Sequence, residues 1–304
     1  MPDYSSAYSA ALRSFLDRYD RMSTAAAHQV ITSYSTSFSL ATRLLSSQIR
    51  EDIRNLYAMV RIADEIVDGT VEAAGLSHAE CVQMLDEYER AVLDAPHCRF
   101  HVDPVLHAYA QSARRCSFDP AHVEAFFASM RRDLTQSTYD AGSFDSYVYG
   151  SAEVIGLLCL SAFLVDNPVG GSERERLESG ARSLGAAFQK VNFLRDLAED
   201  SDVLGRTYFP GLERESLTEA RKDELIADIR ADLAQASSVM GYLPVSARAG
   251  VLAAANLFAE LTDRIDALPA QELTRRRVSV PPHVKARIIV TSLASTPRLK
   301  AGRP

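Results

Sequence analysis

Glycine is scarce in this sequence, and the turns typical of β-hairpins are missing. Glycine accounts for 14 of the 304 residues, below its usual share of about 7%. Asn-Gly or Asp-Gly turns between alternating apolar residues, the strongest short-range sign of a hairpin, are essentially absent. Ala, Leu, Arg and Glu are abundant instead. The composition therefore favours helices over sheets.

The four cysteines are not spaced like the disulfide-forming cysteines of a small domain or like the ligands of a zinc site. They lie far apart and form no Cys-x-x-Cys pair, so neither a disulfide scaffold nor a zinc site is indicated. We therefore expect a protein of the reducing cytoplasm. The cysteines are Cys81, Cys98, Cys116 and Cys159.

Long apolar runs are also absent. The most apolar stretch, residues 154–165, has 12 residues and is flanked by Glu153 and Asp166, whereas a membrane span needs about 20. The first residues carry acids and serines in place of the basic start and apolar stretch of a signal peptide. We expect a buried core helix at 154–165, with no leader and no transmembrane segment.

Acidic residues are missing from the C-terminal end. Residues 273–304 contain eight basic residues and no acid, while the first 272 residues contain 25 basic and 40 acidic ones. Such a segment suits phosphate groups or an anionic membrane surface. We expect a solvated tail at residues 296–304 and phosphate binding by the cluster Arg275–Arg277. We expect no binding of nucleic acid.

Helix starts and breaks recur along the chain and predict its organisation. Helix starts are predicted from capping boxes and from an Asp-Pro pair, at Ser77–Glu80, Ser172–Glu175, Ser216–Glu219 and Asp119-Pro120. Turn-forming residues break the pattern at 94–104, 166–172, 205–211 and 267–272. We predict one all-α domain of about eight to ten helices over residues 1–304. Its core lies at about 30–293, and a basic tail at 294–304.

A narrow charged stripe marks the helix predicted at residues 56–68. At 100° per residue, Tyr57, Arg61, Asp64 and Asp68 fall within a sector of roughly 60°, and most other positions are apolar. A helix that is apolar nearly all round is buried, so the stripe is expected to face an internal cavity. The alternative is a solvated stripe with an Arg61–Asp64 pair.

A second stripe lies on the helix predicted around residues 188–200. Gln189, Asn192, Asp196 and Asp200 share one side of it. Alone this pattern is ordinary, but two helices now each offer aspartates spaced i,i+4 on one side. Facing pairs of this kind suit Mg²⁺ ions that bridge diphosphates. The predicted basic partners of such a substrate are Arg61, Lys190, Arg195, Arg206 and Arg275–Arg277.

A di-iron centre is the competing metal site in a helical bundle. It needs Glu-x-x-His motifs on two helices, and the sequence contains none. The di-iron alternative is therefore excluded.

Four blocks of the sequence resemble the head-to-head prenyl synthases, the family of squalene, dehydrosqualene and phytoene synthases. The most specific block reads Asn-x-x-Arg-Asp-x-x-x-Asp followed by Gly-Arg-x-Tyr-x-Pro, and family-like spacing extends from about residue 30 to 290. Bacterial phytoene synthases are the most similar members. The blocks are residues 34–45, 56–68, 147–156 and 188–210.

The resemblance implies an isoprenoid synthase helical bundle with a central tunnel and Mg²⁺, replaceable by Mn²⁺, at its mouth. The implied metal ligands are Asp64, Asp68, Asn192, Asp196 and Asp200, and the implied catalytic residues are the four aspartates with Tyr147. The implied substrate-binding residues are Ser35, Ser37, Phe38, Thr42, Tyr57, Arg61, Gly156, Gln189, Asn192, Arg195 and Arg277. A purely structural role for Gly156 is an equal alternative.

Three positions depart from the family pattern. Glu65 replaces a frequent aspartate, and Glu153 stands where glycine is common. Phe258 replaces a tyrosine whose hydroxyl would reach a diphosphate, which puts that one contact in doubt.

By resemblance, the expected reaction is the condensation of two geranylgeranyl diphosphates to phytoene, through a cyclopropylcarbinyl diphosphate, in carotenoid synthesis. Thr42 lies one helical turn beyond Phe38. Its side chain is small, so no aromatic ring would block a twenty-carbon tail at this part of the wall.

The expected partners are geranylgeranyl diphosphate, an anionic membrane and other carotenoid-pathway enzymes, without NADPH. The alternatives are squalene or dehydrosqualene synthesis from farnesyl diphosphate, head-to-tail elongation, which the second motif fits poorly, and a non-catalytic helical partner subunit.

Overall fold

A computed structural model describes residues 4–199, 205–212 and 217–296 of the chain. Within these ranges the chain forms helices joined by short loops, and its single β-bridge, between Thr138 and Thr207, belongs to no strand. The all-α prediction is confirmed. The α-helices are α1 (Tyr4–Tyr34), α2 (Thr36–Thr42), α3 (Ser47–Val67), α4 (Thr70–Ala73), α5 (His78–Asp94), α6 (Pro104–Cys116), α7 (Pro120–Asp133), α8 (Ala141–Val148), α9 (Val154–Leu164), α10 (Gly171–Arg195), α11 (Leu197–Glu199), α12 (Glu219–Val239), α13 (Val245–Asp266), α14 (Ala270–Leu273) and α15 (Pro282–Ser295). Short helices of other types are η1 (Ala95–His97), η2 (Tyr149–Glu153) and η5 (Met240–Tyr242).

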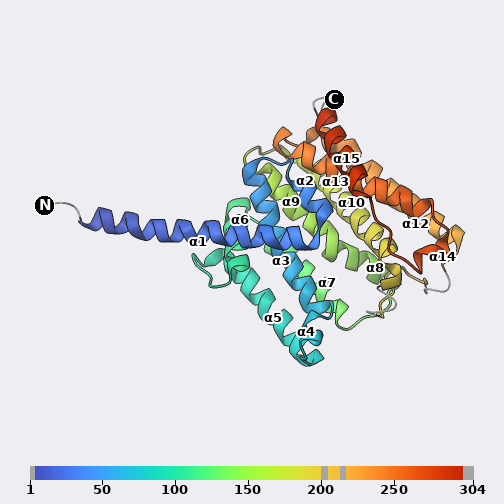
Figure 1. The fold of residues 1–304 in the computed structure, drawn as a ribbon, viewed down its shortest axis with the longest axis horizontal. Helices are drawn as coiled ribbons and strands as arrows, with labels where there is room; N and C mark the ends of the chain where they lie inside the picture. Colours follow the sequence, from blue (N-terminus) through green and yellow to red (C-terminus); the bar gives the residue numbers. More distant parts are fainter. Residues whose placement is uncertain (1–3, 200–204, 213–216, 297–304) are drawn as a thin grey trace.

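The helices surround two large hydrophobic clusters. One cluster joins side chains of α3, α5, α6, α7 and α9, and the other joins side chains of α8, α10, α12, α13 and α15. Helix α1 extends beyond the rest of the molecule at its N-terminal end (Figure 1), while its C-terminal half packs on α3 and α6. Ser23, Ala27 and Ile31 are fully buried in that contact.

Two of the predicted helix starts are confirmed. Ser77 and Glu80 form the capping box of α5, and Asp119 accepts a hydrogen bond from the Ala121 backbone at the start of α7. The start predicted at Ser172 is wrong, because α10 begins at Gly171 with Gly170 at its N-cap and no side-chain cap. Ser216 lies outside the described residues.

The start of α12 also differs from the prediction. The capping side chain is Thr218, which accepts a hydrogen bond from the Arg221 backbone N–H at 3.2 Å. The helix therefore starts at Glu219, because a hydroxyl directly before the first turn can reach the free N–H groups there.

The apolar run predicted as a core helix belongs to a longer continuous helix, Ala141–Leu164, made of α8, η2 and α9. By length and composition alone this helix could cross a membrane, but 56% of its apolar window is buried inside the protein. It packs against α7 and α10, which is the placement expected of a core helix. Of the basic tail predicted at 294–304, only residues 294–296 lie within the described residues.

Candidate active site

A pocket of about 1010 Å³ lies between the two hydrophobic clusters. Its volume is at the upper end of the usual range for ligand sites, about 300–1,000 Å³. Every described residue that the family resemblance implied as a metal ligand, catalytic residue or substrate contact lines this pocket. Asp200, which belongs to the same set, lies outside the described residues. The lining members of the set are Ser35, Ser37, Phe38, Thr42, Tyr57, Arg61, Asp64, Asp68, Tyr147, Gly156, Gln189, Asn192, Arg195, Asp196 and Arg277.

The first aspartate pair lies at the C-terminal end of α3. Asp68 is the C-cap, and its backbone N–H bonds the carbonyl of Asp64. Gly69 then takes a left-handed conformation with φ 92°, which favours glycine and ends the helix. The helix therefore presents its two carboxylates one turn apart, at its negative dipole end.

Arg61 is held inside the charged stripe of α3. Its guanidinium pairs with the Glu65 carboxylate, lies 3.8 Å from the Asp64 carboxylate and packs over the Tyr34 ring. The Arg61–Asp64 pair, which the alternative of a solvent-exposed stripe predicted, is therefore present. It lines the pocket, however, so the prediction that the stripe faces a cavity is confirmed.

Burial and the negative charge of Asp68 raise the pKa of Asp64 well above its ordinary value. The Asp64 side chain keeps 29% of its surface accessible, but that surface faces the pocket. The two neighbouring carboxylates repel each other, and a bound cation would offset that repulsion.

The second motif lies at the C-terminal end of α10. Asp196 is the C-cap of this helix, and its backbone N–H bonds the carbonyl of Asn192. Its carboxylate accepts hydrogen bonds from the guanidinium groups of Arg195 and Arg277, each with Nε 2.8 Å away. Both aspartate motifs therefore end a helix at the same pocket.

The donor set fits a hard divalent cation. Asp64, Asp68 and Asp196 supply carboxylate oxygens, the ligands that Mg²⁺ prefers, at the negative ends of two helix dipoles. The side-chain oxygen of Asn192 is buried without a hydrogen-bond partner, although such groups are nearly always paired. Among the described residues, no three acidic, His or Cys side chains gather tightly enough to enclose a metal by themselves.

The predicted basic partners divide into two groups. Arg61, Arg195 and Arg277 line the pocket, and so does Lys285, whose ammonium donates to the Thr36 hydroxyl at 2.6 Å. Burial and the charge of Arg195 lower the pKa of Lys285, as expected for a partly buried cation beside another cation.

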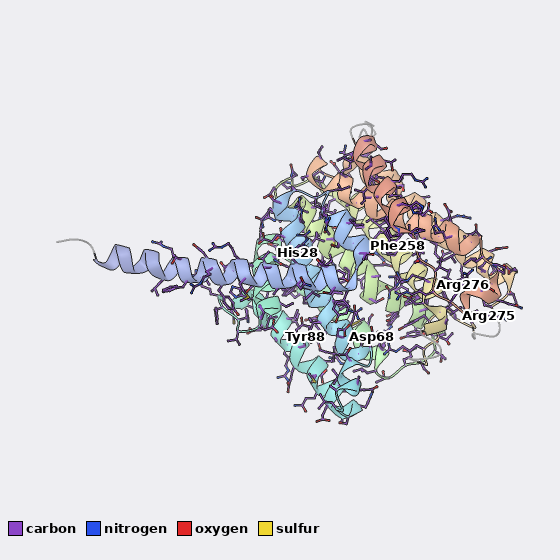
Figure 2. The ribbon with its side chains drawn as sticks, viewed as in Figure 1. His28, Asp68, Tyr88, Phe258, Arg275 and Arg276 are labelled. Atoms are coloured by element: carbon purple, nitrogen blue, oxygen red, sulfur yellow. The ribbon has the colours of Figure 1, made fainter. Side chains whose placement is uncertain are left out.

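The other predicted cations do not line the pocket. Lys190 bonds the carboxylates of Asp228 and Asp232 on α12. Arg275 and Arg276 pair with Glu272 and are 66% and 60% exposed, and Figure 2 shows them near the edge of the molecule, beside α14. These side chains point away from the pocket because they lie on other faces of their segments.

Arg206 is also placed differently from the prediction. It is buried, and it contacts Asp68 of the first motif instead of lining the pocket.

Aromatic rings form part of the pocket wall. The rings of Phe188 and Phe258 stack with their centroids 3.9 Å apart, and Phe38 packs against both of them. Phe258 thus fills its position with a ring contact where the family pattern has a hydroxyl. Tyr57 lies near Phe38 as well, with ring centroids 6.3 Å apart.

Small residues bring α10 close to the wall formed by η2 and α9. A Cβ on Gly156 would lie 2.3 Å from the backbone oxygen of Ala181, and one on Gly185 would lie 2.4 Å from that of Ala152. Gly156 therefore has the structural role, although it also lines the pocket. The π-helix η2 lies in this wall, and π-bulges of this kind are common at functional sites. Its last residue, Glu153, pairs with Arg182 of α10.

The sequence prediction missed one acid in the pocket wall. Asp133, the last residue of α7, accepts hydrogen bonds from the Tyr147 hydroxyl at 2.8 and 2.9 Å and from the Tyr208 hydroxyl at 3.3 Å. Burial raises the pKa of Asp133 to about 7, against the opposing charge of Arg206. A signal existed in the sequence, because Phe126, Met130 and Asp133 share one face of α7, and that otherwise apolar face ends on a carboxylate.

Comparisons with known proteins agree with this architecture. The family model described as "Squalene/phytoene synthase" matches residues 31–283. Phytoene synthase 3, chloroplastic, of Zea mays is 30% identical over 266 residues, which are 82% of this chain and 60% of the maize protein. The 15-cis-phytoene synthase of Enterobacter agglomerans is 24% identical over 281 residues, which are 85% of this chain and 91% of that protein. The chain thus spans less than two thirds of its maize relative and nearly all of the bacterial one.

Solved structures show the same fold. A dehydrosqualene synthase crystallised with a ligand superposes with a TM-score of 0.77 at 19% identity, covering 93% of this chain and 99% of that one. A squalene synthase from Alicyclobacillus acidocaldarius gives a TM-score of 0.68 at 17% identity, covering 85% and 97%.

Proposed function

This chain belongs to the squalene/phytoene synthase family, and from that premise we propose that it is a prenyltransferase that joins two allylic prenyl diphosphates head to head. The observation that carries the proposal is the composition of one pocket. Carboxylates at the ends of α3 and α10 and four cationic side chains share it with a deep apolar wall. A diphosphate with a long isoprenoid tail needs both environments at once.

Mg²⁺ is the proposed cofactor, and Mn²⁺ its substitute. Asp64, Asp68, Asn192 and Asp196 would hold the ions, with Asp200 proposed by resemblance. A bound Mg²⁺ supplies Lewis-acid stabilisation of the leaving diphosphate. Asp64 and Asp68 lie one turn apart at the end of α3 and repel each other, and a bound cation would offset that repulsion.

Other side chains of the pocket are placed to bind the diphosphate, to stabilise a carbocation and to exclude water. Arg61, Arg195, Arg277 and Lys285 are placed to bind diphosphate oxygens, and arginine does so through a planar fork. Phe38, Phe188 and Phe258 line the pocket in which an allylic cation would form, and aromatic rings attract cations. The apolar wall excludes water, which would otherwise quench that cation.

We propose geranylgeranyl diphosphate as the donor and phytoene as the product, formed in carotenoid synthesis without NADPH. The named curated relatives are phytoene synthases, and Thr42 presents a small side chain to the pocket from the end of α2. The alternative is farnesyl diphosphate with squalene or dehydrosqualene as the product. The likeness to solved synthases of those compounds concerns the fold and does not favour one tail length.

We also propose a cytoplasmic enzyme that touches an anionic membrane at its periphery and works beside other carotenoid-pathway enzymes. The exposed pair Arg275 and Arg276 supports the membrane contact, and a hydrocarbon product needs an apolar phase to receive it. The contact is proposed as peripheral.

Product analysis tests the proposed function. The purified protein is incubated with Mg²⁺ and geranylgeranyl diphosphate, farnesyl diphosphate or both in competition, and hexane extracts are analysed. Phytoene should form and should dominate in competition. Squalene or dehydrosqualene as the main product would overturn the tail length, and no hydrocarbon from either donor would overturn the function.

A further inference from the structure

Asp133 is a buried carboxylate at a junction of four segments. Its side chain is 4% exposed, and Asp133 is one of the residues that line the pocket. Both of its oxygens accept hydrogen bonds from the single hydroxyl of Tyr147, at 2.9 and 2.8 Å. The Tyr208 hydroxyl, 3.3 Å from one of them, is a further donor. A buried carboxylate with this many donors is held in one orientation.

Arg206 connects Asp133 to the first aspartate motif. Its Nη1 lies 3.9 Å from the Asp133 carboxylate and donates to the Asp68 carboxylate at 2.9 Å. Its Nη2 donates to the Val67 backbone carbonyl at 2.6 Å, which fixes the guanidinium against the end of α3. The charges of Asp133 and Asp68 raise the pKa of Arg206, despite its burial, so it stays charged between them.

The contacts therefore form a continuous path from Tyr147 through Asp133 and Arg206 to Asp68. Four separate segments contribute to the path: α8, the end of α7, the segment 205–212 and the end of α3. The path joins the apolar wall to the carboxylates proposed to hold the metal.

We propose that Asp133 is a positioning residue that fixes the Tyr147 hydroxyl and, through Arg206, the Asp68 carboxylate in a defined relation to each other. The proposal rests on the proposed function for the reaction that it serves. A phenol has one proton to donate, and Tyr147 donates it to Asp133. The Tyr147 oxygen is therefore available only as an electron-rich acceptor toward the pocket, where positive charge would develop on an allylic carbon.

Asp133 also holds Arg206 in place. While Asp133 is a carboxylate, it attracts the guanidinium of Arg206, and Arg206 in turn fixes the orientation of the Asp68 carboxylate. With Asp133 neutral, this attraction is lost and Asp68 is oriented less firmly. The affinity of the site for divalent ions should then fall, because removal of a residue that orients a metal ligand typically costs about 10–100-fold.

Asp133→Asn is the first test, because it keeps the size of the side chain and removes its charge. Binding of Mn²⁺ to the substrate-free protein, followed by electron paramagnetic resonance, should weaken by about 10–100-fold. In the assay, kcat should fall by a similar factor while KM for the prenyl diphosphate changes little. Mn²⁺ binding remains informative even if neither donor gives a product, so failure of this inference and failure of the proposed function are distinguishable.

Asp52→Asn is the matched control. Asp52 is also a buried carboxylate, bonded to Ser112 at 2.8 Å and to Arg115 at 2.5 Å, and it is not among the residues that line the pocket. Its loss should lower the melting temperature and leave kcat and Mn²⁺ affinity as they are. This comparison separates the positioning role from the cost of losing any buried charge.

Tyr147→Phe tests the contact between Tyr147 and Asp133, and Arg206→Gln tests the contact between Arg206 and Asp68. Tyr147→Phe combined with Asp133→Asn should lose less activity than the product of the two single effects, since both variants break the same contact. Arg206→Gln should lower Mn²⁺ affinity even if Asp133→Asn does not fold. The proposal is overturned if Asp133→Asn, or Arg206→Gln in its place, folds and keeps wild-type Mn²⁺ affinity. Fully multiplicative losses in the double variant would also overturn it.

Discussion

The guanidinium of Arg206 donates a hydrogen bond to the carboxylate of Asp68 at 2.9 Å, although 138 positions separate the two residues in the sequence. Arg206 belongs to the segment that follows the second aspartate motif, and Asp68 completes the first. The bond therefore ties the regions of both motifs together at one side of the pocket. It also places a buried positive charge, 7% exposed, behind the carboxylates, where it offsets part of their repulsion.

Both aspartate motifs should be required for activity, each independently of the other. Asp64→Asn or Asp196→Asn keeps the size of the side chain and removes a charge from the proposed metal site. We expect kcat to fall by more than about 100-fold in each variant, in line with the loss of one strong electrostatic contact to a leaving group. Steady-state turnover with excess Mg²⁺ measures this. Near-normal turnover in either variant would refute the metal-cluster interpretation.

Thr42→Phe should shorten the tail that the pocket accepts. Thr42 is buried at the end of α2 and lines the pocket beside Ala41, and a packed wall has little slack for an added ring. We expect weaker use of geranylgeranyl diphosphate and relatively better use of farnesyl diphosphate, measured as a ratio of kcat/KM values. If the variant keeps the wild-type ratio, another part of the wall sets the length.

Binding to anionic liposomes should depend on Arg275 and Arg276 but not on Arg277. Arg275 and Arg276 lie near the edge of the molecule (Figure 2) and outside the pocket. Arg277 is similarly exposed, but it lines the pocket and bonds the Asp196 carboxylate. Each exposed cation near an anionic surface contributes about 1 kcal/mol, so Arg275→Ala with Arg276→Ala should reduce flotation, and added salt should do the same. Equal binding to neutral and anionic lipid would contradict the proposed membrane contact.

The stability of the folded protein should fall as pH rises from about 4 to about 7, because of Asp133. Its ordinary pKa is 3.8, and burial raises it to about 7 in the folded chain. Between these values the folded state keeps a proton that the unfolded state has lost, so the stabilisation present at low pH disappears as pH approaches the folded pKa. The neighbouring charges are Arg206 and Asp68, with the hydroxyls of Tyr147 and Tyr208.

Thermal unfolding in EDTA measures this effect. Asp133→Asn cannot titrate, so the melting temperature of the wild type relative to the variant should be highest near pH 4.5 and decline toward pH 8. A difference that stays constant across this range would show that Asp133 does not hold a proton in the folded state.

The charged stripes could be predicted from sequence because they depend on helical periodicity alone. Tyr57, Arg61, Asp64 and Asp68 recur at intervals of three and four, so any straight helix puts them on one side. That these side chains face a pocket could be predicted because the rest of this helix surface is mostly apolar. The small Thr42 was placed in the same way, relative to Phe38, within one short helix.

Contacts between distant segments could not be predicted in this way. The partner of Asp133 depends on how α7 packs on α8 and on the path of the segment 205–212, and neither is periodic. Lys190 lies next to Gln189 in sequence, yet it pairs with α12, because one position rotates a side chain by 100° around the helix. The π-helix η2 has no sequence rule that would locate it.

The helix ends show the same limit on a smaller scale. Capping boxes were correct at Ser77 and wrong at Ser172, although both have a Glu three residues later. A hydroxyl caps only the turn that it directly precedes, and packing against neighbouring helices decides where that turn begins.

The linkage formed between the two substrates tests the central claim most directly. Geranylgeranyl diphosphate labelled with ¹³C at the carbon bearing the diphosphate is incubated with the protein and Mg²⁺, and the hydrocarbon product is examined by ¹³C NMR. Head-to-head condensation to phytoene joins the two labelled carbons as an equivalent pair, so one enriched olefinic resonance should appear. The account would be contradicted if no hydrocarbon carried the joined pair of labels and the enriched carbons still bore diphosphate.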